Sequence, residues 1–192
     1  LLPSFLRHAK RDVSVTLTDL HPNVAAYRRI KELHPDHIDV CVTPTDATNV
    51  PENLTGMRTI FEGIHHMPPD IAEKIIADAV KQRQPIFIFD VTGRNIPHVI
   101  WMLLFLPVTI LLSTPFIRPF NWRWIITTYV LPISLFMIVW DGIVSCLRSY
   151  SPSELLEMAD NADPDQTFSF TAGSLLPFEL GLIWFLGVPK ES

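Results

Sequence analysis

Residues 85–90 read Pro85-Ile86-Phe87-Ile88-Phe89-Asp90, an apolar run that ends in a carboxylate. Such a run is typical of a strand buried on both faces of a parallel sheet. Outward from it, β-branched and apolar residues indicate three more strands, at 13–18, 38–42 and 57–61. Apolar residues at helical spacing fall between the strands, at 24–33 and 69–82. This alternation with short connections predicts a parallel, doubly wound α/β sheet.

Polar residues recur where these predicted strands end. The first ends at Asp19, Asp46 follows the second, Glu62-Gly63-Ile64-His65-His66 follows the third, and Asp90 closes the fourth. In open α/β sheets, ligands bind beyond the carboxyl ends of the strands. We therefore expect a ligand site at this edge of the sheet.

The two ends of the chain supply further elements. Ser151-Pro152-Ser153-Glu154 combines a capping residue, a proline and an early acid, and it predicts a helix over about 154–160. Residues 166–171 and 180–186 are predicted to form two strands, as a closing hairpin. The chain opens with apolar residues 1–6 followed by basic residues, and we interpret this opening as a helix of a longer protein.

Composition excludes several classes of function. The formal net charge is −5 and the chain has no long basic run, which argues against nucleic acid as a partner. The two cysteines, Cys41 and Cys146, are far apart in the sequence, which favours a reducing compartment and argues against a zinc site. We expect a cytoplasmic protein, associated or not with the inner face of the membrane.

An apolar insertion interrupts this otherwise ordinary composition. Residues 96–140 contain only two charged side chains, Arg118 and Arg123. We expect residues 96–147 to form a hydrophobic helical hairpin inside a single domain over 1–192, with its turn near the two arginines. Three arrangements fit its length: a hairpin that dips into one leaflet, a lid packed on the domain or on a second copy, and a spanning hairpin.

The charge and proline pattern bears on these alternatives. A spanning hairpin would carry both arginines across the membrane, against the positive-inside bias. Pro107, Pro115 and Pro132 are also expected to interrupt its helices. The interfacial anchors of a dipping hairpin would be five aromatic residues: Trp101, Trp122, Trp124, Tyr129 and Trp140.

Several motifs resemble one family in chain order. They are Thr18-Asp19-Leu20-His21-Pro22-Asn23, Asp46-Ala47-Thr48-Asn49-Val50-Pro51, Ile64-His65-His66-Met67 and the strand end at Asp90. They resemble the second to fifth strand ends of class I, Rossmann-like S-adenosylmethionine-dependent methyltransferases. The stretches 115–120, 140–148 and 150–155 look like a largely uncharacterised bacterial branch of that superfamily. The family's first strand and its Gly-rich loop are not in this sequence, and a chain without them is expected to be inactive or impaired.

The resemblance implies a set of cofactor contacts. Asp19 would accept hydrogen bonds from both ribose hydroxyls of S-adenosylmethionine, as acids do at this place in Rossmann-type folds. Asp46 would accept from the adenine amino group, and Leu20 and Ala47 would flank the ring. Glu62 and Gly63 would line the site near the methyl group. The alternatives are a helix N-cap for Asp19, a loop aspartate for Asp46 and core packing for the apolar pair.

Catalytic groups are less clearly indicated. His65 or His66 could accept a proton from the methyl acceptor, since histidine titrates near neutrality. Their alternative roles are helix capping and packing. Asp90 could contact substrate or cap the next helix. Methyl transfer mainly needs in-line positioning, so a dedicated base is not required. Adjacent histidines do not converge on one metal ion, and no metal site is expected.

Three functions fit these residues. The first is methyl transfer to a small apolar or lipid-like acceptor. The second is a nicotinamide-dependent oxidoreductase, which Asp46-Ala47 and the closing strand pair disfavour. The third is a non-catalytic, membrane-associated or assembly module with a degenerate cofactor site. Residues 96–140 would in each case meet a membrane surface, a second copy or a large ligand.

Overall fold

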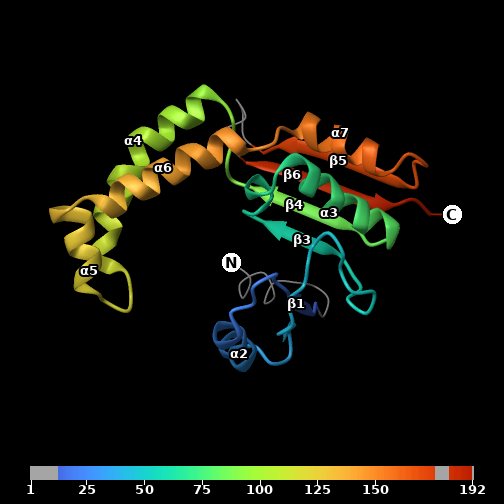
Figure 1. The fold of residues 1–192 in the computed structure, drawn as a ribbon, viewed down its shortest axis with the longest axis horizontal. Helices are drawn as coiled ribbons and strands as arrows, with labels where there is room; N and C mark the ends of the chain where they lie inside the picture. The colour runs from blue at the N-terminus through green and yellow to red at the C-terminus, as the bar shows by residue number, and fades with distance from the viewer. Residues whose placement is uncertain (1–12, 176–181, 192) are drawn as a thin grey trace. The chain divides into compact units, whose positions relative to one another are not determined.

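The computed structural model describes residues 13–175 and 182–191. The chain forms two compact units, the first ending at Thr55 and the second beginning at Gly56 (Figure 1). The helix expected at 1–6 and the first residues of the strand expected at 180–186 lie outside the described residues.

The first unit contains a strand–helix–strand segment. Strand β1 (Val15–Leu17) pairs in parallel with β2 (Ile38–Val40), and α2 (Val24–Leu33) connects them. Asn23 caps α2, because its side chain accepts a hydrogen bond from the amide of Ala26. The predicted parallel pairing of these two strands is confirmed.

The second unit is built on a four-stranded mixed sheet with the order β3-β4-β6-β5. Its strands are β3 (Arg58–Phe61), β4 (Ile86–Asp90), β5 (Phe168–Ser174) and β6 (Ile183–Pro189). Strands β3 and β4 are parallel, whereas β6 runs antiparallel to both β4 and β5. The predicted closing hairpin is confirmed, and its strands begin and end two or three residues later than predicted.

Two helices cover one face of this sheet. Helix α3 (Pro69–Lys81) packs beside α7 (Pro152–Ala162), and both contribute to one apolar core with the strands (Figure 1). Ile76, Ile88 and Phe185 are almost fully buried in it. Helix α7 begins with the predicted capping signal, in which Ser151 and Glu154 bond each other's backbone amides.

The apolar insertion forms the predicted helical hairpin. Its elements are α4 (Ile96–Ser113), η2 (Thr114–Phe116), α5 (Trp122–Ile125), the π-helix η3 (Ile126–Val130) and α6 (Ile133–Arg148). Helices α4 and α6 pack side by side, and the hairpin extends away from the sheet of its unit (Figure 1).

One expectation about the prolines was wrong. Helix α4 continues through Pro107 without ending. A proline removes one helical hydrogen bond, but the flanking turns are continuous apolar helix, and the hydroxyl of Thr109 donates to the carbonyl of Phe105 within the same stretch. Pro132 does interrupt the second arm, where the chain bends by 77° between the segments Trp122–Val130 and Ile133–Arg148.

The whole is a mixed α/β fold with its parallel strands where the sequence predicted them. The predicted doubly wound sheet also has the pair β1–β2 on the other side of a gap from the pair β3–β4, where the family's first strand would lie. That part of the fold, and with it the single domain over 1–192, stays a prediction.

Candidate functional site

The centre of the candidate site is a buried pair of side chains, His65 and Asp90. Nδ1 of His65 lies 2.8 Å from each carboxylate oxygen of Asp90, and both side chains are 4% exposed. Asp90 is the last residue of β4, and His65 lies in the turn η1 (Ile64–His66) that follows β3. The pairing of Phe61 with Phe89 brings these two strand ends to one edge of the sheet.

The role of each nitrogen of His65 follows from the charge of Asp90. With Asp90 ionised, Nδ1 must carry the proton that bonds the carboxylate, which leaves Nε2 as the acceptor. The hydroxyl of Thr92 lies 3.3 Å from the same Nδ1 and completes the network. His66, which is exposed, contacts His65 with 4.1 Å between the ring centroids and the ring planes tilted by 45°. The arrangement is that of an imidazole held by a carboxylate and able to accept a proton.

The two acids of this edge both have raised pKa values. Burial raises the pKa of Asp90 above its ordinary value, although the hydrogen bonds and charge of His65 act in the opposite direction. Glu62 is exposed, but partial desolvation by neighbouring protein atoms raises its pKa, and the carboxylate of Asp90 adds to that shift. Two titratable acids next to a histidine are typical of sites where protons are held or moved.

Glu62 and Gly63 form the turn between β3 and His65. Glu62 has a φ of 53°, a left-handed conformation that is uncommon for a residue with a side chain. Its amide donates to the carbonyl of Phe89, which ties the turn to β4. Such backbone strain tends to occur at functional sites, where the surrounding structure maintains it.

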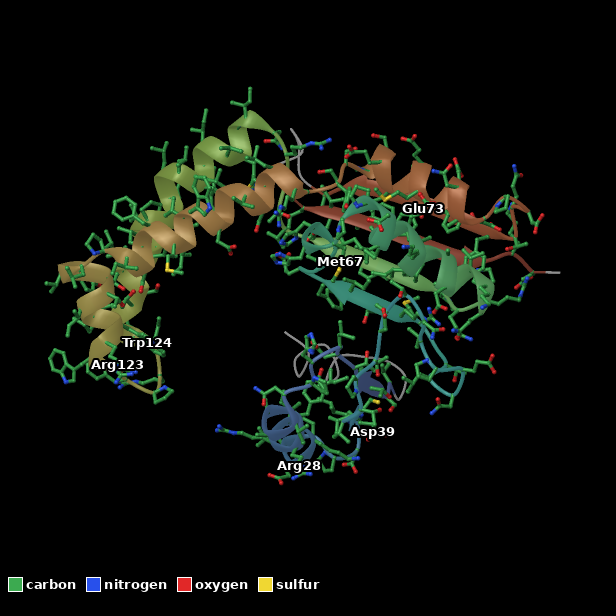
Figure 2. The ribbon with its side chains drawn as sticks, in the orientation of Figure 1. Arg28, Asp39, Met67, Glu73, Arg123 and Trp124 are labelled. Atoms are coloured by element: carbon green, nitrogen blue, oxygen red, sulfur yellow. The ribbon has the colours of Figure 1, made fainter. Side chains whose placement is uncertain are left out.

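An open pocket of about 800 Å³ lies beside the pair. His65 and His66 form part of its wall, together with Met67 after η1 and Glu73 on α3, both labelled in Figure 2. The remaining wall comes from α7 and from the two ends of the hairpin: Arg94, Leu147, Arg148, Tyr150, Glu154 and Met158. The pocket therefore joins the histidine to the root of the apolar insertion.

Some of these residues were missed by the sequence analysis. Tyr150 is buried and its hydroxyl donates to the carbonyl of Met67 at 2.6 Å. Arg94 forms a 2.7 Å ion pair with Glu154, which also caps α7. Thr92 and Arg94 follow Asp90 within four residues. The composition of the loop after this strand end was therefore the signal that could have identified them.

Two of the acids assigned to the cofactor, Asp19 and Asp46, lie in the first unit, and the structure brings their loops together. The amide of Thr45 donates to the carbonyl of Asp19 at 2.9 Å, which holds the Asp46 loop against the end of β1. One oxygen of Asp19 accepts from the amide of His21, and one oxygen of Asp46 accepts from the amide and the hydroxyl of Thr48. These bonds lower the pKa of Asp46.

The structure decides between several alternatives for these residues. Asp19 does not cap α2, because Asn23 does, and Asp90 does not cap α4, because Asn95 does. Leu20 and Ala47 are both exposed, so core packing does not account for them. Among residues 13–175 and 182–191, no three histidine, cysteine or acidic side chains gather as a metal ion would require.

The candidate site residues belong to two different units. Asp19, Leu20, Asp46 and Ala47 are in the first, whereas Glu62, Gly63, His65 and Asp90 are in the second. The carboxylates of the first unit suit hydroxyl and amino donors, since each keeps acceptor capacity beyond its local bonds. The exposed apolar side chains beside them suit a flat ring. The residues present therefore fit an adenosine-containing cofactor.

Comparison with known proteins gives a fold likeness and no family. No family model matches the sequence, and no curated protein matches it. A chain of the Pnkp1/Rnl/Hen1 RNA repair complex is similar in structure over 97% of this chain and 34% of its own, with 12% identity and a TM-score of 0.51. This protein thus spans about a third of that chain.

Two further solved structures are similar at the same 12% identity. One, from Rhodobacter sphaeroides, is described as a candidate Zn-dependent alcohol dehydrogenase, and the likeness covers 93% of this chain and 76% of that one at a TM-score of 0.50. The other, from Nostoc punctiforme, is described as a candidate O-methyltransferase, with 91% and 44% covered and a TM-score of 0.46. The likeness to the first two of these structures is one of fold alone.

Proposed function

We propose that the protein transfers a methyl group from S-adenosylmethionine to an apolar or lipid-like acceptor. The observation that carries the proposal is the position of β6, antiparallel between β4 and β5. This closing pair is what the resemblance to class I methyltransferases implies, and it disfavours the nicotinamide-dependent alternative. The ordered polar strand ends, which resemble the same family, support it independently.

The residues of the first unit would bind the cofactor. Asp19 would accept from the ribose hydroxyls through the carboxylate capacity that its bond to His21 leaves over. Asp46 remains ionised, because hydrogen bonds from Thr48 lower its pKa, and it would accept from the adenine amino group. Leu20 and Ala47 offer exposed apolar surface to the ring.

The residues of the second unit would act on the acceptor. Bound S-adenosylmethionine supplies an electrophilic methyl group on a sulfonium sulfur. Nε2 of His65 would take the proton that the acceptor atom loses as it is methylated, and Asp90 would stabilise the imidazolium through Nδ1. Glu62 and Gly63 would shape the approach beside them. The pocket at the root of the hairpin would hold the acceptor, and its contact with the apolar insertion favours a lipid-like molecule.

Two other functions make different demands. A non-catalytic membrane or assembly module has no need for a buried histidine–carboxylate pair beside a pocket. An oxidoreductase would bind a nicotinamide cofactor through the same Asp19. A non-catalytic module and a methyltransferase would both act at the cytoplasmic side of the membrane. Cellular location therefore does not distinguish these two functions.

A calorimetric titration tests the proposal. The full-length protein is expected to bind S-adenosylmethionine and not NADH. Asp19→Ala removes a charged acceptor of two hydrogen bonds, and each contributes about 1.5–3 kcal/mol, so the affinity is expected to fall roughly 10-fold to 150-fold for each bond lost. Asp39→Ala is the matched control, an exposed carboxylate of the same unit that pairs with Lys31. Binding of NADH alone, or equal affinity of Asp19→Ala and the native protein, would contradict the proposal.

A further inference from the structure

The hairpin exposes an unusually large apolar surface, and we infer that a lipid bilayer covers it. By length and composition, Ile96–Phe116 could cross a membrane, and the bent pair Trp122–Val130 and Ile133–Arg148 would be a second crossing if it forms one span. Only 11% of the first stretch is buried within the protein. The inference does not depend on the methyl transfer proposed above.

The width of the exposed surface distinguishes lipid from a protein partner. On α4 the exposed apolar side chains include Ile100, Trp101, Leu103, Leu104, Phe105, Val108 and Leu112. At 100° per residue these positions cover about 200° around the helix axis. A helix that packs on a protein core presents an apolar stripe of roughly 100°. Hydrocarbon surrounds a helix on every free side, and it therefore suits α4 better than a second copy of the chain.

Aromatic residues mark both ends of the apolar surface. The exposed Trp101 lies in the second turn of α4, near the root of the hairpin. Trp122 and Trp124 lie at the opposite end, where Figure 2 shows Trp124 beside Arg123. From Trp101 to the end of η2 the helix rises about 23 Å, which is shorter than the roughly 30 Å of a hydrocarbon core. Tryptophan concentrates at the level of lipid headgroups.

The charged residues of the hairpin also suit a membrane surface. Arg118 and Arg123 are the only formally charged residues of 96–140, and both are exposed in the turn of the hairpin. Guanidinium groups next to tryptophan suit the phosphates of lipid headgroups. A buried protein interface would leave these two charges to be paired by the partner. We therefore infer that the bilayer contains anionic lipid.

Membrane insertion would also place the pocket. Arg94 lies just before α4, and Leu147 and Arg148 are the last two residues of α6. All three line the pocket together with His65. With the arms in lipid, this root lies at the membrane surface. If the proposed function is correct, the acceptor is an amphiphile that reaches His65 from the bilayer.

Flotation of the 192-residue protein with vesicles tests the inference. The probes are vesicles of phosphatidylethanolamine with phosphatidylglycerol, and vesicles of phosphatidylcholine alone. The protein is expected to float with both, and more completely with the anionic set. Arg118→Gln/Arg123→Gln is expected to abolish the difference between the two sets and to leave flotation itself.

A charged variant provides the decisive comparison. Leu104→Asp/Phe136→Asp introduces carboxylates at positions that are 62% and 70% exposed, so folding in water tolerates them. In hydrocarbon they are strongly disfavoured, and the vesicle-bound fraction is expected to fall at least about tenfold. Leu33→Asp, on α2 at 66% exposure, is the matched control and should float like the native protein.

Three results would overturn the inference. One is a native protein that stays with the soluble fraction, and another is a Leu104→Asp/Phe136→Asp variant that floats as well as the native protein. The third is a monodisperse dimer in the absence of detergent, which would assign the surface to a second copy. None of these results depends on methyl transfer, so failure here is distinguishable from failure to bind S-adenosylmethionine.

Discussion

Replacing Asp90 by asparagine isolates the charge of the buried pair from its shape. Asparagine keeps the size of the side chain and its oxygen, which can still accept from Nδ1 of His65. The carboxylate contributes charge-assisted hydrogen bonds of about 1.5–3 kcal/mol, but burial opposes its ionisation and raises its pKa. We expect Asp90→Asn to cost less than about 1.5 kcal/mol of unfolding free energy near pH 7. Asp90→Ala, which leaves Nδ1 with only the more distant hydroxyl of Thr92 at 3.3 Å, should cost about 3 kcal/mol.

The pH dependence of this effect has a definite sign. Because the pKa of Asp90 is raised in the folded protein, the folded state binds its proton more tightly than the unfolded state does. The contribution of this group to stability therefore increases as the pH falls below the raised pKa, and it is complete below the ordinary value of 3.8. Asp90→Asn lacks this gain. The stability difference between the native protein and Asp90→Asn should widen between pH 7 and pH 4, by up to about 1.4 kcal/mol per pH unit within the window.

Urea unfolding at several pH values, followed by circular dichroism, measures both effects. The other titratable groups of this edge are His65, His66 and Glu62, and they are present in both proteins. Asp70→Asn, an exposed carboxylate at the start of α3, controls for surface charge and should change stability by less than about 0.5 kcal/mol. A stability gap that narrows toward pH 4 would refute the reasoning, because it would mean that the folded state favours the ionised Asp90.

Two further predictions concern the sheet of the second unit. Asp163 is buried and accepts from the amide and hydroxyl of Thr167 and the amide of Phe168, and these bonds lower its pKa although burial opposes them. Asp163→Asn should cost about 2 kcal/mol at pH 7. In urea unfolding, this loss of unfolding free energy should decrease as the pH falls through the lowered pKa of Asp163. Gly187→Ala would place a Cβ 2.8 Å from the ring of Phe170 and 3.1 Å from Ile86, and a loss of about 1–3 kcal/mol is expected in the same assay.

Local patterns in the sequence were enough to predict most elements. Ile86 and Ile88 are apolar because their face of β4 is buried beneath α3 and α7, whereas Phe87 and Phe89 on the other face are only half-buried, so the expectation of a strand buried on both faces was too strong. The capping residues of α7 gave its start to within two residues, because Ser151 and Glu154 act only on their own helix. Strand ends were less well predicted, since the length of β5 and β6 depends on how far each finds a partner. Pairing is a property of two segments, and a pattern in one of them does not determine it.

Some features of the candidate site could likewise be predicted from the sequence, and others could not. Each acid could be assigned to a strand end from its position in the sequence, and the contact between the loops of Asp19 and Thr45 follows from the parallel pairing of β1 and β2. The bond between His65 and Asp90 could not be predicted, because it joins residues 25 positions apart and depends on which histidine turns inward. The short turn η1 decides this: it buries His65 and leaves His66 in solvent.

The hairpin shows that composition alone does not determine helix geometry. Its lack of charge predicts an apolar surrounding, whichever way the helices run. Pro107 and Pro132 look alike in the sequence, yet α4 continues through the first and the second arm bends by 77° at the second. Pro132 adjoins the wide π-helical turn Ile126–Val130, whereas Pro107 lies within regular helix with Thr109 bonded to Phe105. The backbone around a proline, more than the proline itself, therefore determines whether a helix ends.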